Sequence, residues 1–367
     1  MPRDPERITV RVAGHEHRDW LSYQAESDLL TPADAWRVSL GIPAGQVPAY
    51  VKPWAPMELL LGDDVVLTGR IDRIERFVAK GEQTLTLNGR DNAAVLVDCS
   101  APIRTRREVD LAEAVDLLVK PLGLTKVRVD ATGHKKKVEV EPGMTAWDAI
   151  KRLCEANGCW AWCEPDGTLV VGGPDYVTPP VAELVLRLDG LGNNVKTINV
   201  VDDVSGRHSE VTVLGQTHGT ESASGQHNLV AVERDAGVDG YRPLILTDSD
   251  VDSQAEATRR ARKAIADSRL EGFTIEVCVR GHRAGSGEPW RPGQRVRLIS
   301  EPHGLDAIYY MMRRSFLGGR DRGTTTELTL KEDGVWLPDL AASAKTGKGK
   351  GKGKTKSAGR VVDVYEQ

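Results

Sequence analysis

Two distant stretches of the chain share one pattern of β-strands. Residues 54–61 read WAPMELLL and residues 290–298 read WRPGQRVRL, so each opens on a Trp-x-Pro step that leads into an apolar or alternating run. Each stretch is followed by a second run with Leu-Thr-Leu at its centre, TLTLNGRD at 84–91 and ELTLKEDG at 327–334. Apolar residues that alternate with polar ones predict strands with one buried face.

An internal duplication explains why one chain carries this pattern twice. Under that hypothesis, equivalent strands begin at Trp54 with Pro56 and at Trp290 with Pro292. Chance similarity between alternating strands is the alternative explanation.

The stretch between the two β regions has a helical pattern. EVDLAEAVDLLVKPLG repeats apolar residues at helical spacing, with Asp110 placed to cap its start. TAWDAIKRLCEANG predicts a second helix between an N-cap at Thr145 and a C-terminal Gly158. CWAWCEPDGTLVVGG predicts a hairpin turned at 165–167. We therefore expect a small α/β unit between two β regions.

Composition is ordinary for a globular protein, and charge is unevenly distributed. The 367 residues are 40% apolar and 28% charged, with no apolar run long enough for a transmembrane helix. The N-terminus has no secretory apolar segment, so we expect folding in a cytoplasm without membrane insertion. The net charge is −4, and without the six lysines between Lys345 and Lys356 it is −10. Phosphates would be repelled by such an acidic body, which argues against nucleic-acid binding.

No motif with a recognised chemistry is complete. Cys154, Cys159 and Cys163 are spaced C-x4-C-x3-C, unlike a zinc knuckle, so buried apolar cysteines are the favoured interpretation. Gly353-Lys354-Thr355 lacks the earlier glycine of a phosphate loop. The eight histidines form no metal-binding pair, and no nucleophile motif is present. The sequence thus predicts no catalytic residue, no metal and no cofactor.

One stretch suggests a glycan. VEPGMTAWDAIKRLCEANG resembles the opening of a peptidoglycan-binding LysM module, whose second half is missing here. Trp160 and Trp162 would lie on the same side of a strand, either in the core or as a platform on which a sugar stacks. A core position is the favoured interpretation.

Taken together, these segments resemble the Mu-like family of contractile-tail phage baseplate hub proteins. The resemblance is carried by ITVRVAGHEHRDWLSYQAESDLLTPADAWRVSL, by GDDVVLTGRIDRIE followed by TLTLNGRDNAAVLVDCSAP, by the α/β stretch, and by WRPGQRVRLIS through TTTELTLKEDG. It covers nearly all of residues 7–337. The Lys/Gly-rich tail is a departure from the family.

The resemblance implies an α+β, mostly-β fold with two related tube-type β-barrel domains and an inserted α/β domain. The expected divisions are a first barrel at 1–98, the insert at 99–186, a second barrel with one helix at 187–338, and a flexible tail at 339–367. It also implies a homotrimeric, pseudo-sixfold ring that joins the hexameric tail tube to the trimeric central spike. A ring of six similar units matches six tube subunits, whereas its true threefold axis matches a trimeric spike.

The implied partners are further copies of the chain, the tail tube or its initiator protein, the central spike and the surrounding baseplate wedge proteins. The genome would pass through the lumen without specific binding. The implied location is the virion tail baseplate, assembled in the host cytoplasm. Two alternatives stay open, a cell-wall hydrolase and a peptidoglycan-binding protein of the tail tip.

Overall fold

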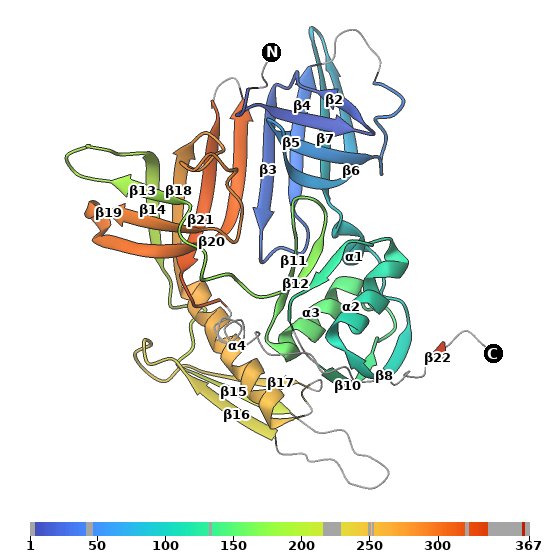
Figure 1. Cartoon of the computed structure of the whole chain (residues 1–367), viewed down its shortest axis with the longest axis vertical. Coiled ribbons are helices and arrows are strands. Elements are labelled where there is room, and N and C mark those ends of the chain that lie inside the picture. Colours follow the sequence, from blue (N-terminus) through green and yellow to red (C-terminus); the bar gives the residue numbers. More distant parts are fainter. Residues whose placement is uncertain are drawn as a thin grey trace, which may run out of the picture.

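The computed structural model describes residues 4–41, 47–131, 134–215, 229–248, 251, 253–319, 323–336 and 362–363. Strands dominate these residues, which confirms the predicted α+β, mostly-β class. Two β portions lie side by side, with the helices and smaller sheets below them (Figure 1). No helix within the described ranges is both long and apolar enough to cross a membrane.

The first β portion contains seven antiparallel strands in the spatial order β2-β1-β5-β6-β7-β4-β3. They are β1 (Ile8–Val12), β2 (His15–His17), β3 (Ser22–Asp28), β4 (Ala35–Gly41), β5 (Pro56–Leu61), β6 (Asp64–Ala79) and β7 (Glu82–Asp91).

The second β portion has the order β13-β19-β20-β21-β18-β14 and joins the first because β20 also pairs with β3. Its elements are β13 (Ala182–Leu186), β14 (Val195–Asp202), β18 (Phe273–Arg280), β19 (Arg295–Ser300), the short 3-10 helix η2 (Glu301–His303), β20 (Leu305–Gly319) and β21 (Thr325–Glu332). One hydrophobic core runs under both portions and includes Leu59, Leu87, Met311 and Leu330.

The two portions repeat the same order of six strands. In chain order and in spatial order alike, β1, β3, β4, β5, β6 and β7 correspond to β13, β14, β18, β19, β20 and β21. We call these the first and second six-strand sets. They differ in one pairing, because β1 runs antiparallel to β5 whereas β13 runs parallel to β19.

The longest strand of each set is irregular at a corresponding place. The β6–β7 register shifts between Ile71 and Arg73, and the β20–β21 register shifts between Met311 and Arg313. Beyond the shift, β6 stays paired with β7 and β20 stays paired with β21, but they no longer pair with β5 and β19, respectively. The shifts therefore give fixed points from which equivalent residues can be counted.

The α/β unit follows the first set along the chain. Its two predicted helices begin and end where the sequence predicts, whereas a short first helix was not predicted. Its elements are α1 (Ala94–Asp98), β8 (Arg104–Asp110), α2 (Leu111–Val119), the 3-10 helix η1 (Lys120–Leu122), β9 (Val127–Val129), β10 (His134–Glu139), α3 (Ala146–Asn157), β11 (Trp160–Cys163) and β12 (Leu169–Gly172). The side chain of Asp110 caps α2, that of Thr145 caps α3, and Gly158 ends α3 in the left-handed conformation. The hairpin β11–β12 turns at Gly167, where φ is 81°.

A further small sheet is inserted between β14 and β18. It contains β16 (Leu229–Arg234), β15 (Glu210–Gly215) and β17 (Pro243–Asp248) in that order, and α4 (Gln254–Gly272) covers it. The sequence predicts the helix but places it within one domain at 187–338, without separating this sheet. The predicted tail at 339–367 lies outside the described residues except for β22 (Val362–Asp363), which pairs with β8.

Candidate assembly site

The two β portions are joined by one strand pair. Residues Arg313–Gly319 of β20 run antiparallel to Ser22–Asp28 of β3. The ring of Tyr23 lies directly over Gly318, where an added Cβ would sit 2.1 Å from the ring carbons. Any side chain other than hydrogen at this position would push the two strands apart, so Gly318 sets how closely the portions approach.

A buried arginine braces this joint. Arg314 is 1% exposed, and its guanidinium donates hydrogen bonds to the carbonyls of Ala25 at 3.0 Å, Val66 at 2.9 Å and Trp290 at 3.2 Å. Burial lowers the pKa of Arg314 to about 10, so the side chain is still charged at neutral pH. Three carbonyls from three separate parts of the chain therefore share one cation.

A neutral histidine lies beside the arginine. The hydroxyl of Thr326 donates to the carbonyl of Gly281 at 2.6 Å, so it accepts from Nδ1–H of His282 at 2.8 Å. Nε2 then accepts from the hydroxyl of Tyr23 at 2.6 Å. Burial, helped by the charge of Arg314, lowers the pKa of His282 to about 3. The histidine is thus a fixed polar link between β3 and the second set.

Two carboxyls, the half-buried Asp34 and the buried Asp91, lie where the first set meets the α/β unit. Asp34 accepts from the hydroxyl of Ser27 and from the backbone N–H of Asp28 at 2.9 Å. Asp91 accepts from the backbone N–H groups of Asp34 at 3.1 Å and Ala93 at 2.8 Å. Burial raises the pKa of Asp34 to about 6. Burial, followed by the charge of Asp34, raises the pKa of Asp91 well above its usual range.

Replacement of Asp34 by asparagine is expected to alter how stability depends on pH. Because its folded pKa lies above the ordinary 3.8, Asp34 contributes stability that is fully present below about pH 4 and is lost as pH rises through about 6. Asparagine cannot ionise, so Asp34→Asn should gain stability relative to wild type across that interval. Urea unfolding at matched pH values measures the difference. A difference that stays constant from pH 4 to pH 7 would contradict the buried ionisation.

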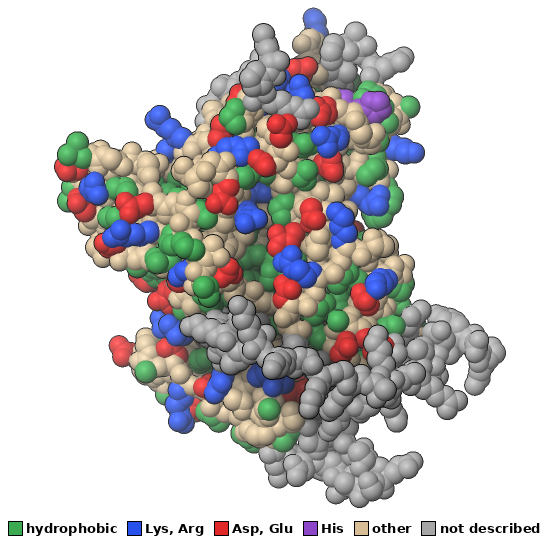
Figure 2. Space-filling view, in the orientation of Figure 1, with side chains coloured by type: hydrophobic (Ala, Val, Ile, Leu, Met, Phe, Trp, Pro, Cys, Tyr) green, Lys and Arg blue, Asp and Glu red, His purple; other side chains and the backbone are tan. Residues whose placement is uncertain are grey.

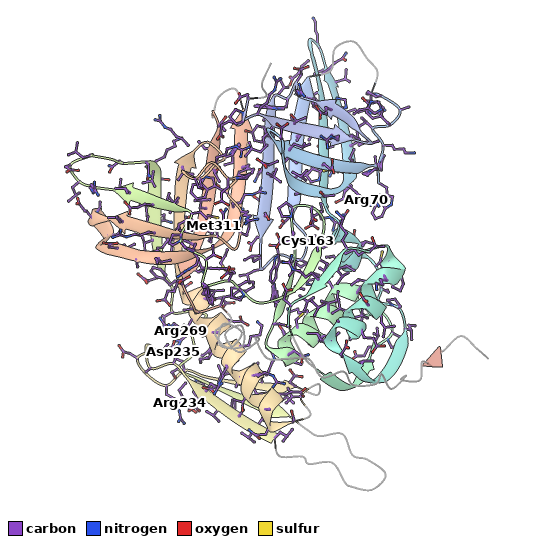
Figure 3. All side chains as sticks on the ribbon, in the orientation of Figure 1. Arg70, Cys163, Arg234, Asp235, Arg269 and Met311 are labelled. Carbon is purple, nitrogen blue, oxygen red and sulfur yellow. The ribbon has the colours of Figure 1, made fainter. Side chains whose placement is uncertain are left out.

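A cysteine lies beside the two carboxyls. Cys163, labelled in Figure 3, lies close to this carboxyl pair, and burial raises the pKa of its thiol well above the usual range. A protonated thiol is a poor nucleophile and a poor metal ligand. The described ranges contain no group of three or more His, Cys, Asp or Glu side chains that could hold a metal ion.

The two Trp-x-Pro tryptophans have different surroundings. Trp54 is 54% exposed and adopts the left-handed conformation with φ 69°, and the guanidinium of Arg70 lies 4.7 Å from its ring centroid. Trp290 is 3% exposed and belongs to the core.

The backbone hydrogen bonds align these segments differently from the sequence motif. The N–H of Trp54 bonds to the carbonyl of Ile71 at 2.7 Å, and the N–H of Gly293 bonds to the carbonyl of Met311 at 2.8 Å. Ile71 and Met311 are the residues before the two register shifts, so Trp54 corresponds to Gly293.

The residues predicted to begin equivalent strands therefore need correction. Pro56 is the first residue of β5, whereas β19 begins only at Arg295, after Pro292. The two motifs lie three positions out of register, because what the turns share is a proline followed by a left-handed residue, Trp54 in one and Gly293 in the other.

The two tryptophans considered as a glycan platform differ in burial. Trp160 is 9% exposed, and its indole N–H donates to the carbonyl of Leu29 at 2.6 Å. The ammonium of Lys263 lies 4.9 Å from its ring centroid. Trp162 is half-buried and packs 6.1 Å from the ring of Trp336. The burial of Trp160 supports the core position favoured from the sequence, whereas Trp162 stays partly exposed.

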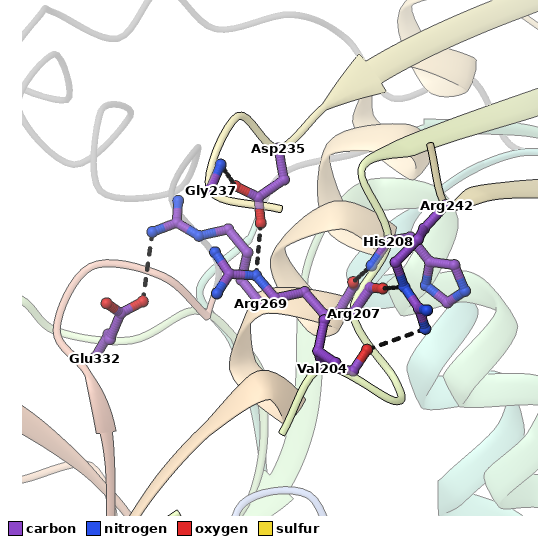
Figure 4. A network of polar contacts seen from close by, with 9 residues as sticks. Val204, Arg207, His208, Asp235, Gly237, Arg242, Arg269 and Glu332 are labelled. Carbon is purple, nitrogen blue, oxygen red and sulfur yellow. Dashed lines mark hydrogen bonds and ion pairs between the residues drawn. The ribbon is translucent and has the colours of Figure 1, made fainter. Parts of the chain in front are cut away.

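A second polar network holds the small sheet against the rest of the molecule (Figure 4). Arg207 donates to Asp235 at 2.9 Å, while Arg242 donates to the carbonyl of Arg207 at 3.0 Å. On α4, Arg269 reaches Glu332 of β21 at 3.4 Å. The helix thus links the small sheet to the C-terminal end of β21.

Sequence reasoning missed Arg314 and His282, the two residues that brace the joint. A usable signal was present in YYMMRRSFLGG, where two arginines interrupt an otherwise apolar strand. Fully buried arginines are rare and are hydrogen-bonded when they occur. Nothing in the sequence distinguishes His282 from the other histidines.

Four family models match successive parts of the chain. Residues 7–91 match the Mu phage baseplate assembly protein GpP-like N-terminal model, and residues 93–173 match the second domain of the baseplate hub protein gp44-like model. Residues 207–265 match the third domain of the tail protein NMB1110-like model, and residues 267–335 match a tail protein C-terminal domain.

Whole proteins match over nearly the full length. The baseplate hub protein gp44 of Escherichia phage Mu is 26% identical over 360 residues, covering 93% of this chain and 92% of that protein. The crystal structure of the tail protein from Neisseria meningitidis MC58 is 38% identical with a TM-score of 0.81, covering 91% of this chain and 98% of that chain. The 43 kDa tail protein of prophage MuSo2 from Shewanella oneidensis has the same fold, at 22% identity and a TM-score of 0.77, covering 89% and 98%.

The matched relatives are structural tail and baseplate hub proteins, and the resemblance inferred from the sequence is confirmed. With 38% identity across nine-tenths of its length, the chain belongs to the family of Mu-like phage tail and baseplate hub proteins.

Proposed function

We propose that the protein is the non-enzymatic hub of a contractile-tail baseplate, in which three copies form a pseudo-sixfold ring between the hexameric tail tube and the trimeric central spike. Baseplate wedge proteins surround this ring, and the genome passes through its lumen. The baseplate hub role of the relatives supports this proposal.

The observation that carries the proposal is the repeated order of six strands. Two similar units in one chain, multiplied by three chains, present six similar surfaces to a sixfold partner. The same three chains have only one α/β unit and one small sheet each, so these parts follow threefold symmetry and suit a trimeric spike.

The proposed domain division keeps a first tube-type barrel at 1–98, an α/β insert at 99–186 and a second tube-type barrel at 187–338. Within the last range, the small sheet at 207–265 is treated as an addition to the second barrel. The change from strands to helices between β7 and α1 supports a boundary in this part of the chain.

The surface chemistry is consistent with a channel that does not hold DNA. On the face drawn in Figure 2, basic and acidic side chains are interspersed, without a broad basic stripe. Nucleic-acid binding surfaces concentrate lysine and arginine on one face. An acidic body repels phosphates and lets DNA slide.

The mass of the purified chain in solution tests the trimer. We expect light scattering to give about 120 kDa for three chains of 40.0 kDa. Electron micrographs of the same sample should show end-on rings with six similar lobes. A protein that is monomeric at every concentration, or rings with another number of lobes, would contradict the proposal.

A further inference from the structure

Among the described residues, two strand edges of the large sheet lack a partner at places that correspond to the joint between the two β portions. β14 pairs with β18 along one edge only. The outer half of β6, Arg73–Ala79, pairs with β7 on one side and has passed the end of β5 on the other. Six strands separate β14 from β6 in the sheet, so these two edges do not meet within one chain.

The joint between the two β portions shows what each edge is built to receive. β14 corresponds to β3, and the outer half of β6 corresponds to Arg313–Gly319 of β20. Within the chain, β3 pairs with that part of β20. Their two counterparts, β14 and the outer half of β6, therefore correspond to the two strands of this pair, but they do not pair with each other within one chain.

We infer that β14 of one copy pairs antiparallel with Arg73–Ala79 of the next copy. This inference deepens the proposed function and rests on it, since it names the contact that would hold the ring together. Unpaired edges invite pairing with another chain, and an edge that is filled in one half of a duplication indicates its partner in the other.

Counting from the register shifts gives the residues that face each other. Arg313 follows the shift in β20 as Arg73 does in β6, so Gly318 corresponds to Val78. Across the β7–β4–β3 and β21–β18–β14 pairings, Tyr23 corresponds to Ile198.

Since Gly318 faces Tyr23, Val78 should face Ile198 of the neighbouring copy. The same count places Arg73 opposite Asp203, as Arg313 stands opposite Asp28.

The side chains at these positions fit a strand contact. At the internal joint a large ring covers a glycine, whereas Val78 and Ile198 would meet as two β-branched residues of medium size. Such cross-strand pairs stabilise antiparallel sheets. Val78 is 69% exposed and Phe77 is 55% exposed, and Val201 on β14 is 41% exposed. Strand pairing would cover these apolar side chains.

The contact is heterologous, because each copy offers one β14 edge and one β6 edge. Heterologous contacts form a closed ring when the rotation between copies divides a full turn, and an open filament otherwise. If copies are related as the two sets of one chain are, six units close the ring and three chains supply them.

A disulfide across the predicted pair tests the register. Facing residues in antiparallel strands have Cα atoms about 4.5–5.5 Å apart, which lies within the range that a disulfide spans. We expect the full-length variant with Val78→Cys and Ile198→Cys to run mainly as a covalent trimer on non-reducing gels after oxidation. Each single variant should stay a monomer, and a mixture of the two single variants should give dimers.

A one-residue shift supplies the matched control. Asn199 lies on the other face of β14 from Ile198, so Val78→Cys with Asn199→Cys should not cross-link. Oxidised wild type, with its five free cysteines, gives the background. A trimer by light scattering without a Val78–Ile198 cross-link would overturn this inference while leaving the proposed function intact. A protein that neither trimerises nor cross-links would overturn both, whereas a ladder of open oligomers would support the strand contact and contradict the closed ring.

Discussion

Arg314→Met is expected to lower the free energy of unfolding by about 3–5 kcal/mol. Methionine keeps much of the side-chain volume but removes the guanidinium, which donates hydrogen bonds to the carbonyls of Ala25, Val66 and Trp290. Arg314 is 1% exposed, so its removal would leave these three acceptors without their donor in a buried place. Urea unfolding followed by tryptophan fluorescence measures the loss.

The neighbouring arginine provides the control. The side chain of Arg313 is 39% exposed and pairs with Glu26 at 2.8 Å, so Arg313→Met should cost less than about 1 kcal/mol. Equal effects of the two substitutions would show that the bracing role belongs to neither residue in particular. An unchanged or raised stability of Arg314→Met would mean that the cost of burying the cation equals or exceeds the benefit of its hydrogen bonds.

Trp160→Ala is expected to cost about 3–5 kcal/mol, as for other large aromatic side chains removed from a core. Trp160 belongs to a small cluster with Leu29, Leu270, Tyr310 and Trp336, which come from the turn after β3, α4, β20 and the end of the second β portion. The substitution would leave a cavity where the α/β unit meets both portions. Thermal unfolding should show a lower midpoint for the whole molecule.

Trp54→Ala is the matched control, because its ring is more than half exposed. We expect a change below about 1 kcal/mol. The pair also tests the alternative role in glycan binding. If Trp160→Ala abolished binding of peptidoglycan fragments without lowering stability, a sugar platform would replace the core position.

Local features of the fold were predictable because they depend on neighbouring residues. Asp110 caps the start of α2, Thr145 caps the start of α3, and Gly158 ends α3, as predicted. Such caps depend only on residues within one helical turn. The Leu-Thr-Leu runs at 84–91 and 327–334 belong to corresponding strands, β7 and β21. Alternating burial within one strand is enough to produce that signal.

Register and long-range partners were beyond sequence reasoning. The two Trp-x-Pro motifs are alike in sequence. The hydrogen bonds to the carbonyls of Ile71 and Met311 nevertheless show that the turns align on Trp54 and Gly293. The three carbonyls bound by Arg314 belong to separate segments of the chain, so no local sequence pattern could predict these hydrogen bonds. The small sheet at 207–265 escaped separation because its strands alternate like those of the set into which it is inserted.

The strand pair that joins the two β portions can form only late in synthesis. The guanidinium of Arg314 and the carbonyl of Ala25 are 289 residues apart along the chain. At a translation rate of about 5–20 residues per second, β3 waits on the order of 15–60 s before β20 leaves the ribosome. During that interval, the edge of β3 that will pair with β20 has no partner in its own chain. It is open to other copies of the chain that are translated from the same messenger RNA. Because β20 of another molecule would satisfy that edge equally well, polysomes are where strand-swapped dimers of this protein should first form.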